Sequence, residues 1–190
     1  MSEPKNGLVL GRFQPFHLGH LEYVEAARSH CRRLFVGITN PDPESRVPSG
    51  ADPKRSLAEN NPFTFAERRT MIEESLWDLG WTGRDFAIVP APILQADRLL
   101  HYLPRPAETT VYMTIYDAWG EQKVEFMSKL GYQVEVLWRR DDDSRVASGT
   151  QIRTLLTSGD DWRVTSGDDW RALVPGAVAR LLGESNFLAS

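Results

Sequence analysis

Two histidines, His17 and His20, lie three residues apart in the stretch GRFQPFHLGH (residues 11–20). Side chains at this spacing share one face where a helix begins. Gly19 stands between them and adds no side chain, so that a ligand and the backbone can approach each other closely. The amides of a helix N-terminus and the guanidinium of Arg12 both favour an anion. The pattern therefore predicts a pocket that binds a polyphosphate.

The same pair of histidines has two other interpretations. A zinc site needs at least one more ligand, for which His30 and His101 are candidates only by default, and the zinc pattern H-E-x-x-H is absent from the sequence. Two histidines with satisfied hydrogen bonds in a core are the ordinary structural alternative. We expect no metal held by protein ligands, and the flanking GRFQPF favours phosphate binding over a core role.

The elements that must position this motif follow from apolar runs and helical spacing. The sequence predicts strands over residues 7–11, 33–39, 85–93, 109–116 and 132–138, and helices over 18–30, 64–80, 96–104, 118–131 and 148–156. This alternation predicts an α/β fold, a doubly wound sheet of five parallel strands followed by C-terminal helices. Ligands bind such sheets beyond the C-terminal ends of the strands, at the topological switch point. The histidine motif directly follows the first strand.

Capping residues mark the expected helix boundaries. Thr64 and Glu67 occupy capping-box positions at the start of the helix over 64–80, and Gly80 suits its end. Ser148 and Gln151 occupy capping-box positions at the start of the helix over 148–156. One or two further helices are expected around WRALV and GAVARLLG, within a C-terminal helical part at about 148–190.

Three segments are expected to be loops. Residues 40–62 are rich in Pro, Ser, Asp and Asn and form either a lid over the pocket or a segment without fixed structure. The charge run RRDDDSR (139–145) is expected to be a solvated loop. The tandem copies TSGDDWRV and TSGDDWRA (157–172) indicate a duplication in a surface loop, in which only one of Trp162 and Trp170 needs to pack against the core.

Composition narrows the function further. The 190 residues suffice for a single α/β domain over 1–190, and 22 basic against 26 acidic residues leave a net charge of −4, so we expect no nucleic-acid partner. The sequence contains no run of about 18 apolar residues and therefore predicts no membrane span. Its first residues, MSEPKNG, lack the apolar part of a signal peptide. Cys31 is the single cysteine, which excludes an intrachain disulfide. These features favour a cytoplasmic protein, whose oligomeric state the sequence leaves open.

Two motifs carry a resemblance to a known superfamily. GRFQPFHLGH resembles the H-x-G-H signature of the nucleotidylyltransferases, and SGTQIR (148–153) resembles their second signature, S-x-T-x-x-R. NPFTFAERRTMI (61–72) and WRALVP (170–175) are similar to stretches of archaeal-type nicotinamide mononucleotide adenylyltransferases. The resemblance covers nearly the whole chain. It implies a Rossmann-like fold and a reaction in which an acceptor oxyanion attacks the α-phosphorus of an NTP and releases pyrophosphate, without a covalent enzyme intermediate.

The resemblance also implies roles for individual residues. The histidines would donate to the triphosphate, the arginines would hold phosphate oxygens, and the helix N-terminus at Ser148 and Thr150 would add hydroxyls and amides. The implied catalytic residues are His17, His20 and Arg153; the implied nucleotide-binding residues are Gly11, Arg12, Phe13, Gly19, Ser148, Gly149, Thr150 and Arg153. Mg²⁺ is the expected cofactor, coordinated by phosphate oxygens and water, and no protein ligand is assigned to it.

The acceptor side departs from the nicotinamide enzymes. TIYDAWGEQK (114–123) stands where they usually carry S-G-N, and ILQADRLLHYLP has no tryptophan where they tend to place one. Four stretches resemble the cytidylyltransferases of phosphonate natural-product pathways, of the phosphonoformate type, more than they resemble the nicotinamide enzymes. These stretches are GITNPDP, NPFTFAER, TIYDAWGEQK and VLWRR. We therefore expect CTP, with ATP as the alternative, and a small phosphonate or phosphate acceptor. Candidate acceptor residues are Lys54, Arg55, Arg68, Asp117, Trp119 and Lys123.

Three competing functions stay in view. The first is a nicotinamide mononucleotide adenylyltransferase, which makes NAD from ATP. The second is a nucleotide-binding module without catalysis, which the presence of both histidines and both arginines disfavours. The third is an aminoacyl-tRNA synthetase, because FMSKL (126–130) is similar to a synthetase loop; however, this stretch falls inside an expected helix and the chain has no basic surplus for tRNA.

Overall fold

A five-stranded parallel sheet forms the centre of the computed structural model, which describes residues 5–43, 57–141, 144, 146–157 and 169–183. The strand order is β3-β2-β1-β4-β5, so the chain is doubly wound and reverses direction across the sheet between β1 and β4. The strands are β1 Asn6–Gly11, β2 Arg33–Thr39, β3 Phe86–Ala91, β4 Thr109–Ile115 and β5 Gln133–Arg139. The α/β fold predicted from the sequence is confirmed.

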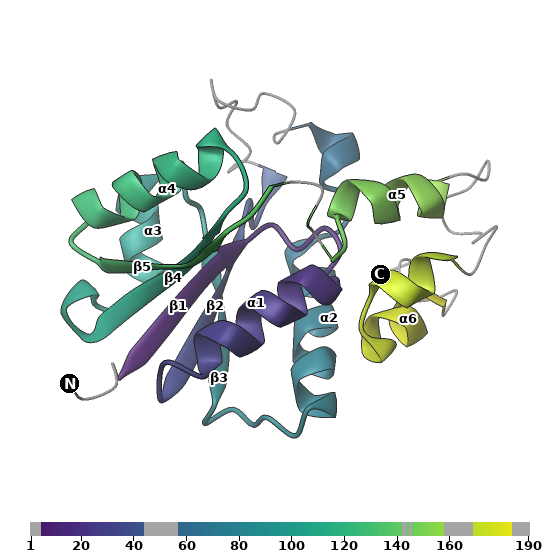
Figure 1. The fold of residues 1–190 in the computed structure, drawn as a ribbon, viewed down its shortest axis with the longest axis horizontal. Coiled ribbons are helices and arrows are strands. Elements are labelled where there is room, and N and C mark those ends of the chain that lie inside the picture. The colour runs from purple at the N-terminus through teal and green to yellow at the C-terminus, as the bar shows by residue number, and fades with distance from the viewer. Residues whose placement is uncertain (1–4, 44–56, 142–143, 145, 158–168, 184–190) are drawn as a thin grey trace.

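Helices cover both sides of the sheet, with α3 and α4 on one side and α1 and α2 on the other (Figure 1). The α-helices are α1 Leu18–Arg28, α2 Phe65–Asp78, α3 Ala96–Tyr102, α4 Ala118–Lys129, α5 Gly149–Thr157 and α6 Gly176–Gly183. Short 3₁₀ helices span η3 Ala58–Asn60, η4 Pro106–Glu108 and η6 Asp169–Leu173. The expected segment around WRALV is therefore a 3₁₀ helix, and FMSKL lies at the end of α4.

Strand side chains alternate between two hydrophobic clusters, one on each side of the sheet. On β1, Leu8 and Leu10 belong to the cluster under α3 and α4, whereas Val9 belongs to the cluster under α1 and α2. Because both faces are buried, the strands read as continuous apolar runs. Trp170, in the second copy of the tandem repeat, is fully buried in the α1/α2 cluster, and Trp162 lies outside the described residues.

The predicted capping residues set the helix ends. Thr64 Oγ1 accepts a hydrogen bond from the Glu67 amide at 3.2 Å, and the Glu67 carboxylate accepts one from the Thr64 amide at 2.6 Å, which completes the capping box of α2. Gly80, just beyond α2, has a φ of 78°. Ser148 Oγ accepts from the Gln151 amide at 3.2 Å at the start of α5.

A tyrosine spans the place where the sheet opens. β1 and β4 pair only over Asn6–Leu8 and Thr109–Val111, and the two strands diverge beyond these residues. The Tyr23 hydroxyl donates to the Tyr112 carbonyl of β4 and accepts from the Leu10 amide of β1. Burial raises the pKa of Tyr23 above its ordinary value, so the hydroxyl keeps the proton that it donates. Tyr23 thereby holds the base of the crevice at the switch point.

A bulge in β5 changes which way its last residues face. Met113 is opposite Val136, but the next residue, Thr114, is opposite Trp138. The alternation expected over 132–138 therefore ends at Val136, and Trp138 packs edge-on against Tyr23 with ring centroids 6.4 Å apart.

The basic start of the 139–145 charge run is structured by ion pairs. The Arg140 guanidinium lies 4.4 Å from the Trp138 ring centroid and binds both carboxylate oxygens of Glu22 at 2.9 and 3.0 Å. Arg139 belongs to β5 and pairs with Glu121. The loop therefore begins one residue later than expected, at Arg140. Arg139 is exposed although it lies in the strand, and Arg140 is only partly exposed because the Glu22 carboxylate of α1 holds its guanidinium.

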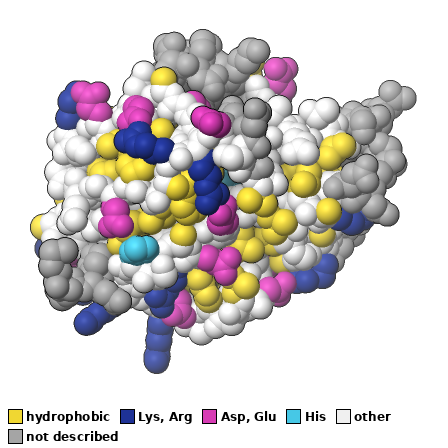
Figure 2. Space-filling model, viewed as in Figure 1, with side chains coloured by type: hydrophobic (Ala, Val, Ile, Leu, Met, Phe, Trp, Pro, Cys, Tyr) yellow, Lys and Arg dark blue, Asp and Glu magenta, His cyan; other side chains and the backbone are white. Residues whose placement is uncertain are grey.

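Charges of both signs are interspersed on the face shown in Figure 2, and hydrophobic side chains gather in a band across its middle. Among the described helices, none is long and apolar enough to cross a membrane.

Candidate active site

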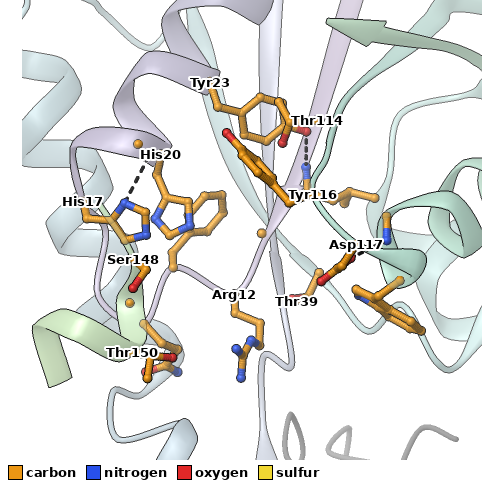
Figure 3. A pocket seen from close by; sticks show the side chains of 18 of the residues that line it. Arg12, His17, His20, Tyr23, Thr39, Thr114, Tyr116, Asp117, Ser148 and Thr150 are labelled. Carbon is orange, nitrogen blue, oxygen red and sulfur yellow. Dashed lines mark hydrogen bonds between the residues drawn. The ribbon is translucent and has the colours of Figure 1, made fainter. Parts of the chain in front are cut away.

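A pocket of about 220 Å³ lies at the C-terminal ends of β1 and β4 (Figure 3). It brings together most of the residues predicted from the sequence: Gly11, Arg12, Phe13, His17, Gly19, His20, Asp117, Trp119, Lys123, Ser148, Gly149, Thr150 and Arg153. The histidines, Ser148 and Thr150 lie on one side of the pocket, Tyr116 and Asp117 lie on the other, and Arg12 lies between them (Figure 3). Lys54 and Arg55 lie outside the described residues.

His17 caps α1 with its own ring. Its Nδ1 accepts a hydrogen bond from the His20 amide at 3.3 Å, which requires that Nδ1 carries no proton. In the neutral ring the proton then sits on Nε2. His17 is buried, so its tautomer and orientation are both set by the turn. The donor of this ring is therefore Nε2–H, and the residue lines the pocket.

His20 is held between aromatic rings. Its ring stacks on His17 with centroids 3.6 Å apart, lies edge-on to Phe13 at 4.8 Å, and stacks near Phe16 at 5.9 Å. These contacts restrict rotation of the imidazole.

The backbone of the loop between β1 and α1 explains why a glycine precedes the arginine. Phe13 is buried and has a φ of 53°, a backbone conformation that residues with a Cβ rarely adopt. Its ring turns back over Gly11, where a Cβ would lie 2.6 Å from the ring. Gly11 and Phe13 thus shape the loop that presents Arg12 and the two histidines.

Arg153 reaches back from α5 to this loop. Its Nη1 donates to the Gln14 carbonyl at 2.7 Å, and its Nη2 donates to Asn60 Oδ1 at 3.1 Å and Thr150 Oγ1 at 3.2 Å. Burial lowers the pKa of Arg153, yet a guanidinium stays charged at neutral pH. A Cβ on Gly149 would lie 2.8 Å from the Gln14 carbonyl oxygen and 3.0 Å from Arg153 Nη1.

Gln14 is a structural member of the site that sequence reasoning missed. Its side-chain amide donates to the Phe63 carbonyl at 2.9 Å and accepts from the Phe63 amide at 3.0 Å. The available signal was its place between two apolar aromatic residues in FQPF, because a buried amide must find partners for both of its polar atoms.

Arg68 differs from its expected role as an acceptor-binding cation. It is fully buried and does not line the pocket. Its guanidinium donates to the backbone carbonyls of Arg12 at 2.9 Å, Thr39 at 2.8 Å, Asn40 at 2.7 Å and Thr64 at 3.1 Å. Arg68 therefore ties the loop between β1 and α1, hereafter the proposed phosphate loop, to the end of β2 and the start of α2. We correct its assignment from ligand contact to support of this loop.

The other candidates on the acceptor side line the pocket. The Asp117 carboxylate accepts from the Gly120 amide at 2.8 Å and caps α4. Trp119 and Lys123 are both partly exposed. Tyr116 also lines the pocket and was not predicted; its hydroxyl accepts from Trp138 Nε1 at 3.0 Å. Among the described residues, no group of three or more His, Cys, Asp or Glu side chains is placed to hold a metal ion.

A model of the cytidylyltransferase-like family matches residues 8–155, which include both the histidine motif and SGTQIR. The chain belongs to this family. The enzyme is 43% identical over 178 residues to the phosphonoformate cytidylyltransferase of Streptomyces viridochromogenes, a match that covers 94% of this chain and 90% of that relative. It is 30% identical over 182 residues to the nicotinamide-nucleotide adenylyltransferase of Methanothrix thermoacetophila, covering 95% of this chain and 90% of that relative.

A solved structure supports the fold of the enzyme. The bifunctional NMN adenylyltransferase/ADP ribose pyrophosphatase from Francisella tularensis superimposes with a TM-score of 0.63 at 18% identity. The match covers 98% of this chain but only 50% of that protein. At this level of identity the likeness concerns architecture alone, and it agrees with the predicted nucleotidylyltransferase fold.

Proposed function

We propose that the enzyme transfers CMP from CTP to a small phosphonate or phosphate and releases pyrophosphate, as a cytidylyltransferase of the phosphonoformate type. The observation that carries this proposal is the 43% identity, over nearly the full length of both chains, to a phosphonoformate cytidylyltransferase. Under this proposal the pocket binds CTP and its acceptor, and a cytoplasmic location stays a prediction from the sequence.

The pocket supplies charge stabilisation and positioning for this reaction. An oxygen of the acceptor forms a bond to the α-phosphorus, the bond from that phosphorus to the bridging oxygen breaks, and pyrophosphate leaves. Negative charge grows on the leaving phosphates, where the Nε2–H of His17 and the ring of His20 would donate hydrogen bonds and the guanidinium of Arg153 would add positive charge. Arg12, in the middle of the pocket, would hold phosphate oxygens between the two substrates.

Mg²⁺ is part of this proposal as the companion of the triphosphate. Asp117 is the carboxylate that lines the described part of the pocket, and it already caps α4. The residues present therefore fit a hydrated ion carried mainly by phosphate oxygens. Such an ion supplies additional neutralisation of the phosphate charge.

On the acceptor side, we propose that Lys123 and the pocket edge at Trp119 meet the small anion. Both line the pocket and belong to α4, the helix that Asp117 caps. Asp117 lies on the side opposite the histidines (Figure 3), where a second anion would have to lie for in-line attack. Lys54 and Arg55 remain proposals made from the sequence.

The second candidate is a nicotinamide mononucleotide adenylyltransferase, favoured by the 30% identity to such an enzyme over most of both chains. The discriminating experiment measures pyrophosphate release with Mg²⁺ while crossing ATP, CTP, GTP and UTP against nicotinamide mononucleotide and phosphonoformate. Release that requires CTP and the phosphonate supports our proposal. Release that requires ATP and nicotinamide mononucleotide makes the chain an NAD-synthesising enzyme. Nucleotide binding without release for any pair would favour a binding module.

A further inference from the structure

Residues 57–63 lie behind the lining of the pocket and are hydrogen-bonded to residues that line it. We call them the 57–63 segment; it contains the 3₁₀ helix η3 and the turn that enters α2. The sequence predicted a lid or an unstructured stretch over 40–62. Most of that stretch, residues 44–56, lies outside the described residues, and the prediction for it stays a prediction. The 57–63 segment makes hydrogen bonds to three residues that line the pocket, namely Gln14, Asn40 and Arg153.

Two of these connections fix the backbone of the segment. The Gln14 amide pairs with both backbone groups of Phe63, at 2.9 and 3.0 Å, in the way that a neighbouring strand would. Asn61 is buried, donates to the Leu57 carbonyl at 2.8 Å and accepts from Asn40 Nδ2 at 3.5 Å. The segment is thus tied to the loop after β1 and to the end of β2.

The third connection reaches the proposed catalytic arginine. Asn60 Oδ1 accepts from Arg153 Nη2 at 3.1 Å. In Figure 1 the short helix near residue 60 lies beside the start of α5, which carries Arg153. The guanidinium is therefore bonded by its own helix through Thr150, by the proposed phosphate loop through the Gln14 carbonyl, and by the 57–63 segment through Asn60.

The chemistry of Asn60 suits this position. An arginine reaches its target on a stem with several rotatable bonds, so acceptors in different directions are needed to hold the plane of the guanidinium. An amide oxygen accepts from the guanidinium without cancelling its charge, whereas a carboxylate at the same place would neutralise it. Asn60 thus orients Arg153 and leaves its positive charge for the phosphates.

We propose that Asn60 is a positioning residue for Arg153, which makes the 57–63 segment part of the phosphate-binding machinery. The proposal rests on the proposed function, because it takes Arg153 to bind the leaving phosphates. It extends the site to an element that neither of the two signature motifs contains.

The test compares three variants by kcat and KM for CTP and by calorimetric binding of inorganic pyrophosphate with Mg²⁺. Asn60→Ala lowers kcat/KM about tenfold, because a hydrogen bond that orients a charged group is lost. Asn60→Asp keeps the shape and pairs with Arg153, and it weakens pyrophosphate binding on the order of 100-fold because the charge is neutralised. Glu59→Ala, the exposed neighbour in the same short helix, is the control and behaves like wild type.

A double-mutant cycle separates positioning from mere support of the fold. In an Arg153→Met background, Asn60→Ala produces no further loss of activity if Asn60 acts through Arg153, whereas independent effects multiply. The inference is overturned if the losses multiply, or if Asn60→Asp binds pyrophosphate as tightly as wild type. Should Asn60→Ala fail to fold, the nearly isosteric Asn60→Asp still decides the matter. A wild-type enzyme that releases pyrophosphate with no substrate pair contradicts the proposed function instead, and is recognised before any variant is made.

Discussion

The imidazole rings of His17 and His20 stack with their centroids 3.6 Å apart and their planes inclined by 22°. The same two residues are joined a second time, through the hydrogen bond from the His20 amide to His17 Nδ1. One histidine thus caps the helix that carries the other. The capping role of His17 and its proposed phosphate contact therefore fall on one ring and must be separated by experiment.

The substitutions His17→Asn and His17→Ala make this separation. Asparagine is a good N-cap, so we expect His17→Asn to unfold near the wild-type urea concentration, whereas His17→Ala loses about 1 kcal/mol of unfolding free energy. Both lack the Nε2–H donor, and both should lower kcat by about 10²–10³-fold. Urea denaturation and pyrophosphate release measure the two effects. Full turnover by His17→Asn would show that the ring acts only as a cap.

Gly149→Ala tests the close approach of α5 to the proposed phosphate loop. The new methyl group would lie 2.8 Å from the Gln14 carbonyl oxygen and 3.0 Å from Arg153 Nη1, so one of them must shift. We expect kcat/KM to fall about 100-fold, because a displacement of about 1 Å in a phosphate-binding group is costly. Gly83→Ala, where a Cβ meets nothing within 4 Å, is the matched control. Equal activities of the two variants would contradict the prediction.

Arg68→Met and Lys123→Ala should separate support of the loop from contact with the acceptor. Removal of the buried Arg68 guanidinium leaves four carbonyl groups without that donor, and we expect a loss of about 3 kcal/mol or more in unfolding free energy. Lys123→Ala should change stability by less than about 0.5 kcal/mol. It should raise KM for the acceptor about tenfold while KM for CTP stays near wild type. A stable Arg68→Met variant with a raised acceptor KM would restore the original assignment.

Acid destabilisation should depend in part on Asp85. Hydrogen bonds from Arg28, and then from the Thr82 amide and hydroxyl, lower the pKa of Asp85 from 3.8 to about 2. Since the folded-state pKa is depressed, Asp85 stabilises the fold above pH 3.8, and this contribution is lost as the pH falls from about 4 towards 2. We therefore expect Asp85→Asn to be less stable than wild type at pH 6, and the gap to narrow below pH 4. Thermal unfolding across this range measures the gap, and a gap independent of pH would refute the assignment.

Local patterns along the chain were sufficient for the elements and for the phosphate side of the site. Apolar runs predicted β2 over the residues that it occupies, and Thr64 with Glu67 predicted the capping box that starts α2. The motifs around His17 and Ser148 predicted residues that line one pocket, although the two motifs are separated by about 130 residues. These features depend on neighbours in sequence or on the rule that ligands meet parallel strands at their C-terminal ends.

Side-chain partnerships between distant segments could not be predicted in this way. Arg68 looks like any other basic residue on an amphipathic helix until four carbonyl groups from three segments surround it. The bulge that turns Trp138 towards Tyr23 follows from the pairing of β4 with β5, which no local pattern records.

The sequence by itself determined the parallel α/β architecture and the capped starts of α1 and α5 that line the pocket, because strand burial, helix capping and glycine placement act over a few residues. Only the tertiary structure decided which arginine supports the loop between β1 and α1 and which one lines the pocket. Arg68 and Arg153 have the same guanidinium, but one lies beneath the loop with its donors on backbone carbonyls and the other lines the pocket. Burial and the direction of each donor are properties of the assembled fold, and they set the role that the residue type leaves open.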